Sequence, residues 1–248
     1  MVVGGLSEKT TEVLDFENFN FVPEFGELPT DHRRSVGGLI GDTMIICGNR
    51  PATKSCLTFK NHKWTETHTM TSKRFGHASV QLDSERIWIL GGKEKENGGF
   101  LDTTEFIQLN RTVGTPGPKL PYALVGMCAV KVAEDKIFVI GGDNGDKKTE
   151  FVSIFNPQDE FSYIEGPPLQ YARFVHSCGL MKDEKHSYLV IAGGFNAVRL
   201  ASIEILNLTT LQWSLGMGYE TNKIKGVKNI SFLTLQDHNY HLKYHIVL

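Results

Sequence analysis

The chain has 248 residues, of which 40% are hydrophobic and 22% are charged, with a formal net charge of −2. This composition is typical of a soluble globular protein, and a near-neutral chain without a basic block is not expected to bind nucleic acid. The sequence lacks both a recognisable signal peptide and an apolar run of the roughly 20 residues that span a bilayer, so we predict no membrane insertion.

An apolar run that ends in two glycines recurs along the chain. Full copies occupy 2–5, 86–92, 136–142 and 188–194, and a degenerate copy at 43–48 has Cys47 in place of the first glycine. The intervals between first-glycine positions are 43, 44, 50 and 52 residues, counted over Gly4, Cys47, Gly91, Gly141 and Gly193. A unit that recurs at this length indicates a repeat architecture. We expect a structural role, ending a strand, for Gly4, Gly5, Gly48, Gly91, Gly92, Gly141, Gly142, Gly193 and Gly194.

Each repeat can be divided into four strands. The first strand precedes a short hairpin, as in 77–82 followed by 83–85, and the second is the glycine run itself. Consecutive apolar residues in the second strand favour burial on both faces. The third strand is exemplified by 104–109. The fourth carries an aromatic residue that we expect to pack between neighbouring sheets, at Phe21, Trp64, Phe161 and Trp213.

Turns rich in proline and glycine separate the repeats, at 26–29, 116–121 and 166–169. No stretch shows a sustained helical period, so we predict an all-β fold. Four-stranded units of about 40 to 50 residues indicate a β-propeller, in which each sheet is buried against its neighbours.

The order of these motifs resembles the kelch repeat. The shared features are the double glycine, a strand with a glutamate and a later Asp or Asn, an aromatic residue, a Leu-Pro turn and an arginine that opens the next unit. The resemblance covers residues 1–220 and implies a single kelch β-propeller domain over 1–248, with four complete blades and one split or incomplete blade. The repeats are placed at about 1–30, 34–70, 74–121, 122–170 and 173–219, with a partial copy at 222–248.

Two arrangements account for the incomplete blade. In the first, 227–235 completes the sheet begun by 2–5, which closes five blades. In the second, the chain is part of a larger ring. The second arrangement is favoured because the tail loses the repeat pattern within a unit.

Arginine opens the first strand of three repeats, at Arg34, Arg74 and Arg173, and Tyr122 takes the equivalent place in another. The resemblance implies that these positions lie near the mouth of the propeller, facing a bound peptide. A guanidinium fork is well suited to holding carboxylates or phosphates. An inter-blade hydrogen bond or ion pair is the alternative role.

The loops that follow each double glycine are the second set of candidates for partner binding. Their residues are Asn49, Arg50, Lys93, Asp143, Asn144, Phe195 and Asn196. The chemistry at these positions changes from repeat to repeat, which suits recognition, although Asn and Asp also favour turns. The charged loop 93–99 is the longest, and loops on a rigid scaffold commonly carry binding residues.

No cofactor or metal site is predicted. His77 and His176 occupy the same place in two repeats and are expected to be structural. The tail histidines His238, His241 and His245 lack the further ligand of a closed zinc site. The glycine runs lack the lysine and helix of a phosphate loop, and the nucleophile elbow of a hydrolase is absent.

The four cysteines are widely spaced and form no C-x-x-C motif. We expect free thiols and therefore a cytoplasmic location; two disulfides and an extracellular location are the alternative.

The predicted function is a non-catalytic module that binds a protein or peptide partner. The kelch resemblance implies substrate recognition in a ubiquitin-ligase adaptor, or actin binding, as specific versions of this role. The alternative is a propeller that binds a small acidic ligand such as a sugar acid, or an enzyme that modifies sugars, because the arginines would suit an acidic sugar.

Overall fold

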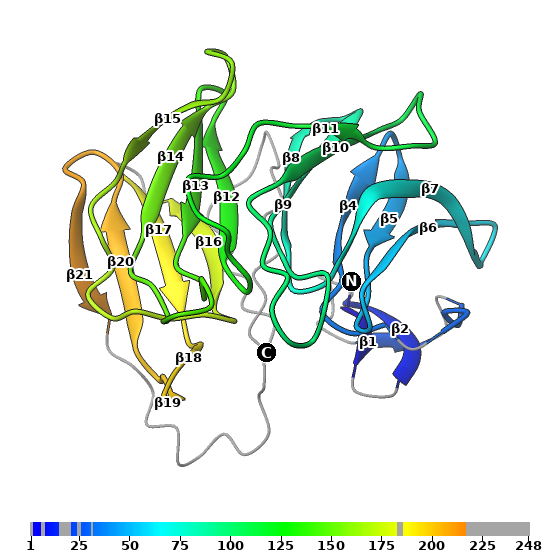
Figure 1. Ribbon diagram of the computed structural model, residues 1–248, viewed down its shortest axis with the longest axis horizontal. Helices are drawn as coiled ribbons and strands as arrows, with labels where there is room; N and C mark the ends of the chain where they lie inside the picture. The colour runs from blue at the N-terminus through cyan, green and yellow to red at the C-terminus, as the bar shows by residue number, and fades with distance from the viewer. Residues whose placement is uncertain are drawn as a thin grey trace. The chain divides into compact units, whose positions relative to one another are not determined.

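The computed structural model describes residues 2–5, 8–14, 21–23, 26–30, 32–182 and 186–216. These residues form strands and turns, and none of them belongs to a helix that could cross a membrane. The chain divides into two compact units, Met1–Val125 (unit 1) and Gly126–Leu248 (unit 2), each considered by itself below (Figure 1). The single domain over 1–248 stays a prediction.

Unit 1 contains one three-stranded and two four-stranded antiparallel sheets, each with its strands in chain order. The three-stranded sheet contains β1 (Val2–Gly5), β2 (Glu8–Leu14) and β3 (Phe21–Pro23). The second sheet contains β4 (Val36–Ile40), β5 (Thr43–Cys47), β6 (Thr53–Lys60) and β7 (Lys63–Arg74). The third contains β8 (Ala78–Asp83), β9 (Arg86–Leu90), β10 (Thr104–Gln108) and β11 (Thr115–Pro116).

Unit 2 contains two further four-stranded antiparallel sheets and a small hairpin. The first sheet contains β12 (Cys128–Ala133), β13 (Lys136–Ile140), β14 (Val152–Asn156) and β15 (Ser162–Glu165). The second contains β16 (Ser177–Lys182), β17 (Ser187–Ala192), β20 (Ile203–Asn207) and β21 (Gln212–Gly216), with the hairpin β18 (Phe195–Asn196) and β19 (Val198–Arg199) between β17 and β20. The prediction of an all-β fold built from repeated four-stranded blade-like sheets is confirmed.

The apolar second strands form the core, as their sequences predict. In unit 1, Ile45 of β5 and Ile89 of β9 belong to one buried cluster that joins the second and third sheets. In unit 2, Ile140 of β13 and Ile191 of β17 belong to a cluster that joins its two large sheets. Neighbouring sheets within each unit therefore pack through their buried side chains.

The aromatic residues of the fourth strands pack between sheets at two of the predicted positions. Trp64 is buried against Leu28, from the turn after β3, and Trp213 donates its Nε1–H to the Pro167 carbonyl at 2.9 Å. The prediction for Phe161 is wrong, because this residue lies in the turn before β15 with φ +57°. The strand position belongs to Tyr163, which stands opposite Phe155 as Trp213 stands opposite Leu206. The longer turn before β15 shifts the aromatic position.

The expectation of free thiols is also wrong. Cys47 and Cys56 are directly opposite on β5 and β6 and form a disulfide, and Cys128 of β12 is bonded to Cys178 of β16. The prediction of a cytoplasmic location rested on free thiols and loses that support. Other predictions lie outside the described residues, namely the blade completed by 227–235 and the roles of His238, His241 and His245.

Candidate functional site

The glycine that follows each second strand has a left-handed backbone. Its φ is +70° at Gly48, +58° at Gly91, +60° at Gly141 and +68° at Gly193. Gly48 is therefore the first glycine of its repeat, Cys47 is the last strand residue, and Asn49 replaces the second glycine. This corrects the predicted register of the degenerate copy by one residue. Gly4 and Gly5 lie at the end of β1.

These glycines allow the opening segment of the next repeat to approach closely. A Cβ added at Gly141 would lie 2.6 Å from the Arg173 carbonyl oxygen and 2.7 Å from Cε1 of His176. A Cβ at Gly48 would likewise collide with His77 and the Arg74 carbonyl. The second glycine adds a hydrogen bond, since Gly142 N–H donates to the Arg173 carbonyl at 2.8 Å. Both a side chain and the usual backbone conformation are excluded here.

Arg74 and Arg173 are enclosed rather than exposed at the surface. Arg74 NH2 lies 2.7 Å from Glu105 Oε1 and Arg173 NH2 lies 2.6 Å from Glu204 Oε1, with all four side chains 0% exposed. Burial lowers the pKa of both guanidinium groups, and the partner carboxylates oppose that shift. We call each pair an Arg–Glu clasp.

Each clasp ties three segments of one repeat together. Arg74 NH1 donates to the Gly91 carbonyl at 2.6 Å, and Arg173 NH1 donates to the Gly193 carbonyl at 2.7 Å. The second oxygen of the glutamate accepts from the backbone before the arginine, as Glu204 does from Gln170 N–H at 2.6 Å. The ion pair predicted as the alternative role is thus present, and for Arg74, the last residue of β7 in the second sheet, it reaches Glu105 on β10 of the third sheet. Neither guanidinium is available to contact a partner.

The sequence pattern places Arg34 and Tyr122 at the same position in their repeats as Arg74 and Arg173. This prediction is wrong, because neither residue occupies the clasp position. A buried leucine or methionine lies four residues before each arginine, at Met70 and Leu169, and the same spacing from Leu28 and Leu120 leads to His32 and Leu124. His32 and Leu124 are buried, and His32 has a backbone hydrogen bond with Gly48, as Arg74 has with Gly91.

Arg34 instead occupies the left-handed position two residues further on. Its φ is +53°, and the equivalent residues Gly76, Gly126 and Val175 have φ of +61°, +65° and +53°. The Arg34 side chain is exposed, and the charges of Arg50 and Glu96 act on it. Among the three arginines predicted to open first strands, Arg34 is thus the one that reaches the surface.

His77 and His176 are buried beside the clasps. Burial, reinforced by the neighbouring arginine charge, lowers the pKa of each to about 3. Both rings are therefore neutral near pH 7 and act in packing between repeats, as predicted.

The glycine loops of unit 1 place exposed charges beside aromatic rings. Arg50 donates from Nε and NH2 to the two carboxylate oxygens of Glu96, at 2.8 and 2.6 Å, and its guanidinium lies 5.7 Å from the Phe75 ring centroid. This pairing raises the pKa of Arg50 and lowers that of Glu96. Lys93 Nζ lies 4.4 Å from the Phe100 ring centroid.

Asn49 has turn chemistry instead. It is buried and its side-chain oxygen accepts from Arg33 and Arg50 N–H at 2.8 and 2.7 Å.

The equivalent loops of unit 2 use different side chains on the same plan. Lys148 Nζ lies 3.0 Å from Asp143 and 5.1 Å from the Phe174 ring centroid, and Phe195 packs edge-on against Phe174. Asn144 accepts from Asp146 and Lys147 N–H, a turn role, and Asn196 is exposed on the small hairpin. In both units, a cation from one glycine loop lies over the phenylalanine that follows the buried arginine of the next repeat.

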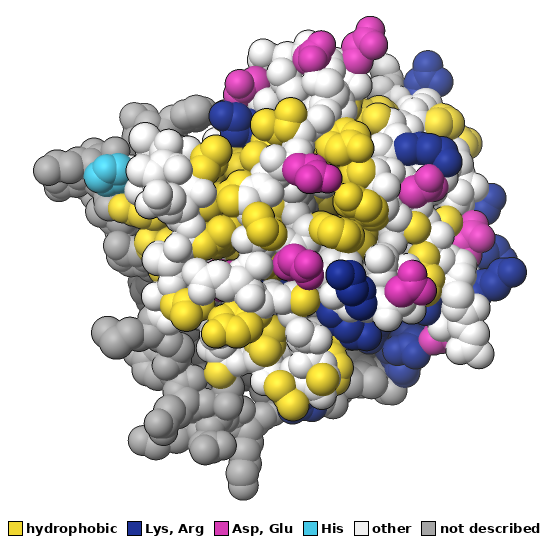
Figure 2. Space-filling model, turned by 60° about the vertical axis from the view of Figure 1, so that its left-hand side comes forward, with side chains coloured by type: hydrophobic (Ala, Val, Ile, Leu, Met, Phe, Trp, Pro, Cys, Tyr) yellow, Lys and Arg dark blue, Asp and Glu magenta, His cyan; other side chains and the backbone are white. Residues whose placement is uncertain are grey.

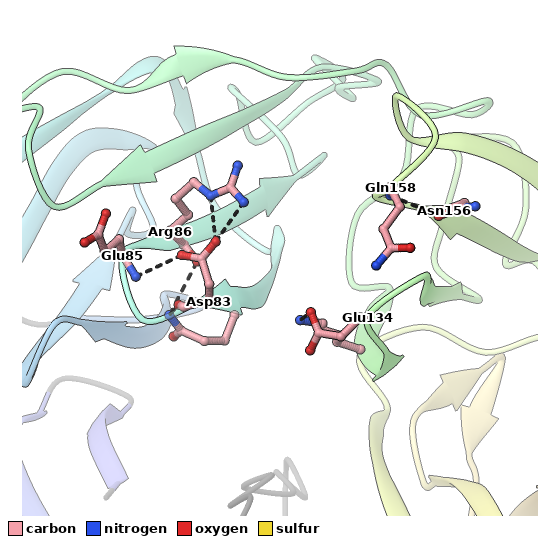
Figure 3. A network of polar contacts seen from close by, with 8 residues as sticks. Asp83, Glu85, Arg86, Glu134, Asn156 and Gln158 are labelled. Atoms are coloured by element: carbon pink, nitrogen blue, oxygen red, sulfur yellow. Dashed lines mark hydrogen bonds and ion pairs between the residues drawn. The ribbon is translucent and has the colours of Figure 1, made fainter.

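The hairpin ends of the sheets carry charges that are paired locally. Figure 3 shows Asp83 accepting from Arg86 Nε at 2.7 Å and from Glu85 N–H at 2.9 Å, which is the turn between β8 and β9. In unit 2, Asn156 accepts from Gln158 N–H at 3.0 Å, and Lys131 lies 2.7 Å from Glu134. These contacts stabilise turns.

Apolar side chains are also exposed. Figure 2 shows hydrophobic side chains at the surface, interspersed with acidic and basic ones. Strand β15 is exposed throughout, with Tyr163 46% and Ile164 67% accessible. Such surface is compatible with a protein partner.

A wide-open surface cavity of about 390 Å³ in unit 1, five of whose six lining residues are exposed, was missed by sequence reasoning. It is lined by Lys54, Thr71, Ser72, Lys73, Glu94 and Lys95. One feature of the sequence could have indicated it: the segment from Trp64 to Arg74 contains neither proline nor glycine, whereas other repeats have a turn with these residues at the same place.

A scan against protein-family models found no match, and a search of the curated proteins found no related sequence.

Proposed function

We propose that this chain is a non-catalytic protein-interaction module of the kelch type, and that its glycine loops contact the partner. One observation carries the proposal: equivalent loops on well-packed sheets present different side-chain chemistry in each repeat, exposed at Arg50 and Phe195 and partly buried at Lys93 and Asp143. The position after the glycine pair is Arg50, Lys93, Asp143 or Phe195. Variable side chains on a rigid scaffold are the usual basis of recognition surfaces.

The clasps hold two of these loops in place. Arg74 and Arg173 fix the segments before β8 and β16 to the carbonyls of Gly91 and Gly193, where the loops that carry Lys93 and Phe195 begin. Pre-ordered loops lose less conformational entropy on binding. The kelch resemblance extends the proposal to substrate recognition for a ubiquitin ligase or to actin binding.

The alternative of a sugar-acid binder or sugar-modifying enzyme rested on a ring of available arginines. Arg74 and Arg173 are paired with glutamates and enclosed, so that basis is removed.

The test is affinity capture with the full chain, followed by cross-linking to locate contacts. The variant Arg50→Ala/Phe195→Ala removes one loop side chain from each unit, and we expect recovery of a specific partner to fall about tenfold, because a few contacts dominate most interfaces. Arg86→Ala, at a hairpin end, is the matched control and should retain the partner. Equal recovery with all three proteins would exclude the glycine loops as the binding face.

A further inference from the structure

The cavity of unit 1 is created by an irregularity in strand β7. Ser55 pairs with Thr69 and Thr53 pairs with Arg74, so one residue of β6 stands opposite four residues of β7. The four residues, 70–73, leave the strand register at the end of the sheet where the glycine loops lie. Strand irregularities of this kind re-aim side chains and are enriched next to functional sites.

The charge of this cavity is unbalanced. Three lysines, Lys54, Lys73 and Lys95, line it from three separate segments, together with a single carboxylate, Glu94. Among the described residues, none of the three ammonium groups forms an ion pair or a hydrogen bond. Two other exposed cations of unit 1 are paired, Arg50 with Glu96 and Arg86 with Asp83, whereas Lys60 and Lys63 are exposed at the other end of β6 and β7. The lysine cavity therefore gathers three positive charges from separate segments in one place, against a single carboxylate.

Two hydroxyl groups complete the lining. Thr71 and Ser72 lie side by side in the irregular segment and can donate hydrogen bonds, as can the three ammonium groups. Apart from Glu94, every lining side chain can therefore donate hydrogen bonds, which suits a ligand with several acceptor oxygens. The volume lies at the lower end of the range for small-ligand sites.

We propose that the lysine cavity receives a phosphate monoester, carried on a phosphorylated side chain of the protein partner. A phosphate carries a charge near −2 at pH 7 and three acceptor oxygens, which match three lysines offset by one glutamate. A single carboxylate has two oxygens and one charge, so it would leave lysine charge uncompensated. The assignment of the phosphate to a protein rests on the proposed function, whereas the phosphate site itself does not.

The first test uses N-acetyl-O-phosphoserine amide as the probe, titrated into the full chain and followed by NMR. We expect amide shifts confined to the cavity residues and weakened by added salt, since screening shortens the Debye length from about 30 Å at 0.01 M to about 3 Å at 1 M. Lys73→Gln/Lys95→Gln should weaken binding about tenfold or more. Lys60→Gln/Lys63→Gln, two exposed lysines at the other end of β6 and β7, should bind like the wild type.

N-acetylglutamate amide separates phosphate from carboxylate recognition. A response as strong as that to phosphoserine would overturn the phosphate assignment in favour of acidic peptide recognition. Shifts outside the cavity, or none, would overturn the site.

A second test treats the captured partner with phosphatase before rebinding. We expect recovery to fall with wild-type chain and to be unaffected by phosphatase with Lys73→Gln/Lys95→Gln. If the chain bound phosphoserine but recovery of the partner did not change after phosphatase treatment, the cavity would be a site for free phosphate compounds. That result would refute the assignment of the phosphate to a protein partner. If Arg50→Ala/Phe195→Ala recovered the partner as well as the wild type did, the proposed function would be refuted. The phosphate site would still be supported by the phosphoserine titration.

Discussion

At the scale of single residues, His77 and His176 behave as apolar side chains. Each lies three residues after a clasp arginine, and the equivalent position before β12 is Met127, which is also buried. A neutral ring fills this space, whereas an imidazolium would add a second buried cation next to the arginine. The position therefore favours the uncharged form.

This environment predicts acid sensitivity. The folded pKa of about 3 lies below the unfolded value of 6.5, so the unfolded chain takes up the proton first. Stability from each histidine is fully present above about pH 6.5 and is lost as the pH falls towards about 3, by an amount on the order of 5 kcal/mol over the whole window. His176→Met should reduce the slope of unfolding free energy against pH, measured by urea unfolding between about pH 7 and pH 4.5. His62→Asn, in the exposed turn before β7, should keep the wild-type slope; an unchanged slope in His176→Met would contradict the assignment.

At the scale of strands, the Arg–Glu clasp is present as a pair or not at all in the four repeats that form four-stranded sheets. The position of Glu105 and Glu204 on the third strand is Leu57 on β6 and Ser153 on β14, as their pairing with the second strands shows. The corresponding clasp positions hold His32 and Leu124, so the two four-stranded repeats without the arginine also lack the glutamate. A buried charge is tolerated only with its partner, which explains the joint replacement.

This pairing leads to a double-mutant prediction. Glu105→Ser leaves Arg74 buried without a partner and should destabilise the protein by about 3–5 kcal/mol. Arg74→Leu/Glu105→Ser copies the residues of the repeat that contains β12–β15 and should recover at least half of that loss. Denaturant unfolding of the wild type, both single variants and the double variant gives the coupling. Additive losses would show that the two side chains contribute independently.

At the scale of the whole molecule, two disulfides reinforce the sheets in different ways. Cys47 and Cys56 lie on neighbouring strands and are 9 residues apart in the sequence. Cys128 and Cys178 lie in two different sheets of unit 2 and are 50 residues apart. In the chain-entropy model, the longer loop restricts the unfolded chain more.

We therefore expect unequal effects of removing each bond. Cys128→Ala/Cys178→Ala should cost about 4 kcal/mol and Cys47→Ala/Cys56→Ala about 2.6 kcal/mol, from loop closure alone. Urea unfolding with and without reductant measures the free energy of unfolding that each disulfide contributes. In each variant, reductant should lower the free energy of unfolding only by the contribution of the remaining disulfide. A larger loss from the shorter loop would argue against the entropic origin.

The sequence by itself determined the strands, their order and the glycine positions, because these depend on local properties. Runs such as Ile87–Leu90 have too few polar groups to lie anywhere but in a core, and a residue with φ near +60° beside a crowded backbone must be glycine. The loop position of Arg50, Phe195 and Asn196 could be predicted for the same reason, because these residues come just after the glycines in the sequence.

Only the tertiary structure decided which side chains meet. The clasp position was misplaced by two residues in two repeats, at Arg34 and Tyr122, because strand and turn lengths vary and sequence spacing does not report contact. The environment of Arg74 depends on Glu105, 31 residues later, and the disulfides and the lysine cavity likewise join segments that are distant in the chain. Burial and charge pairing are properties of these long-range contacts. The local sequence around an arginine therefore does not show whether its guanidinium is exposed or enclosed in an ion pair.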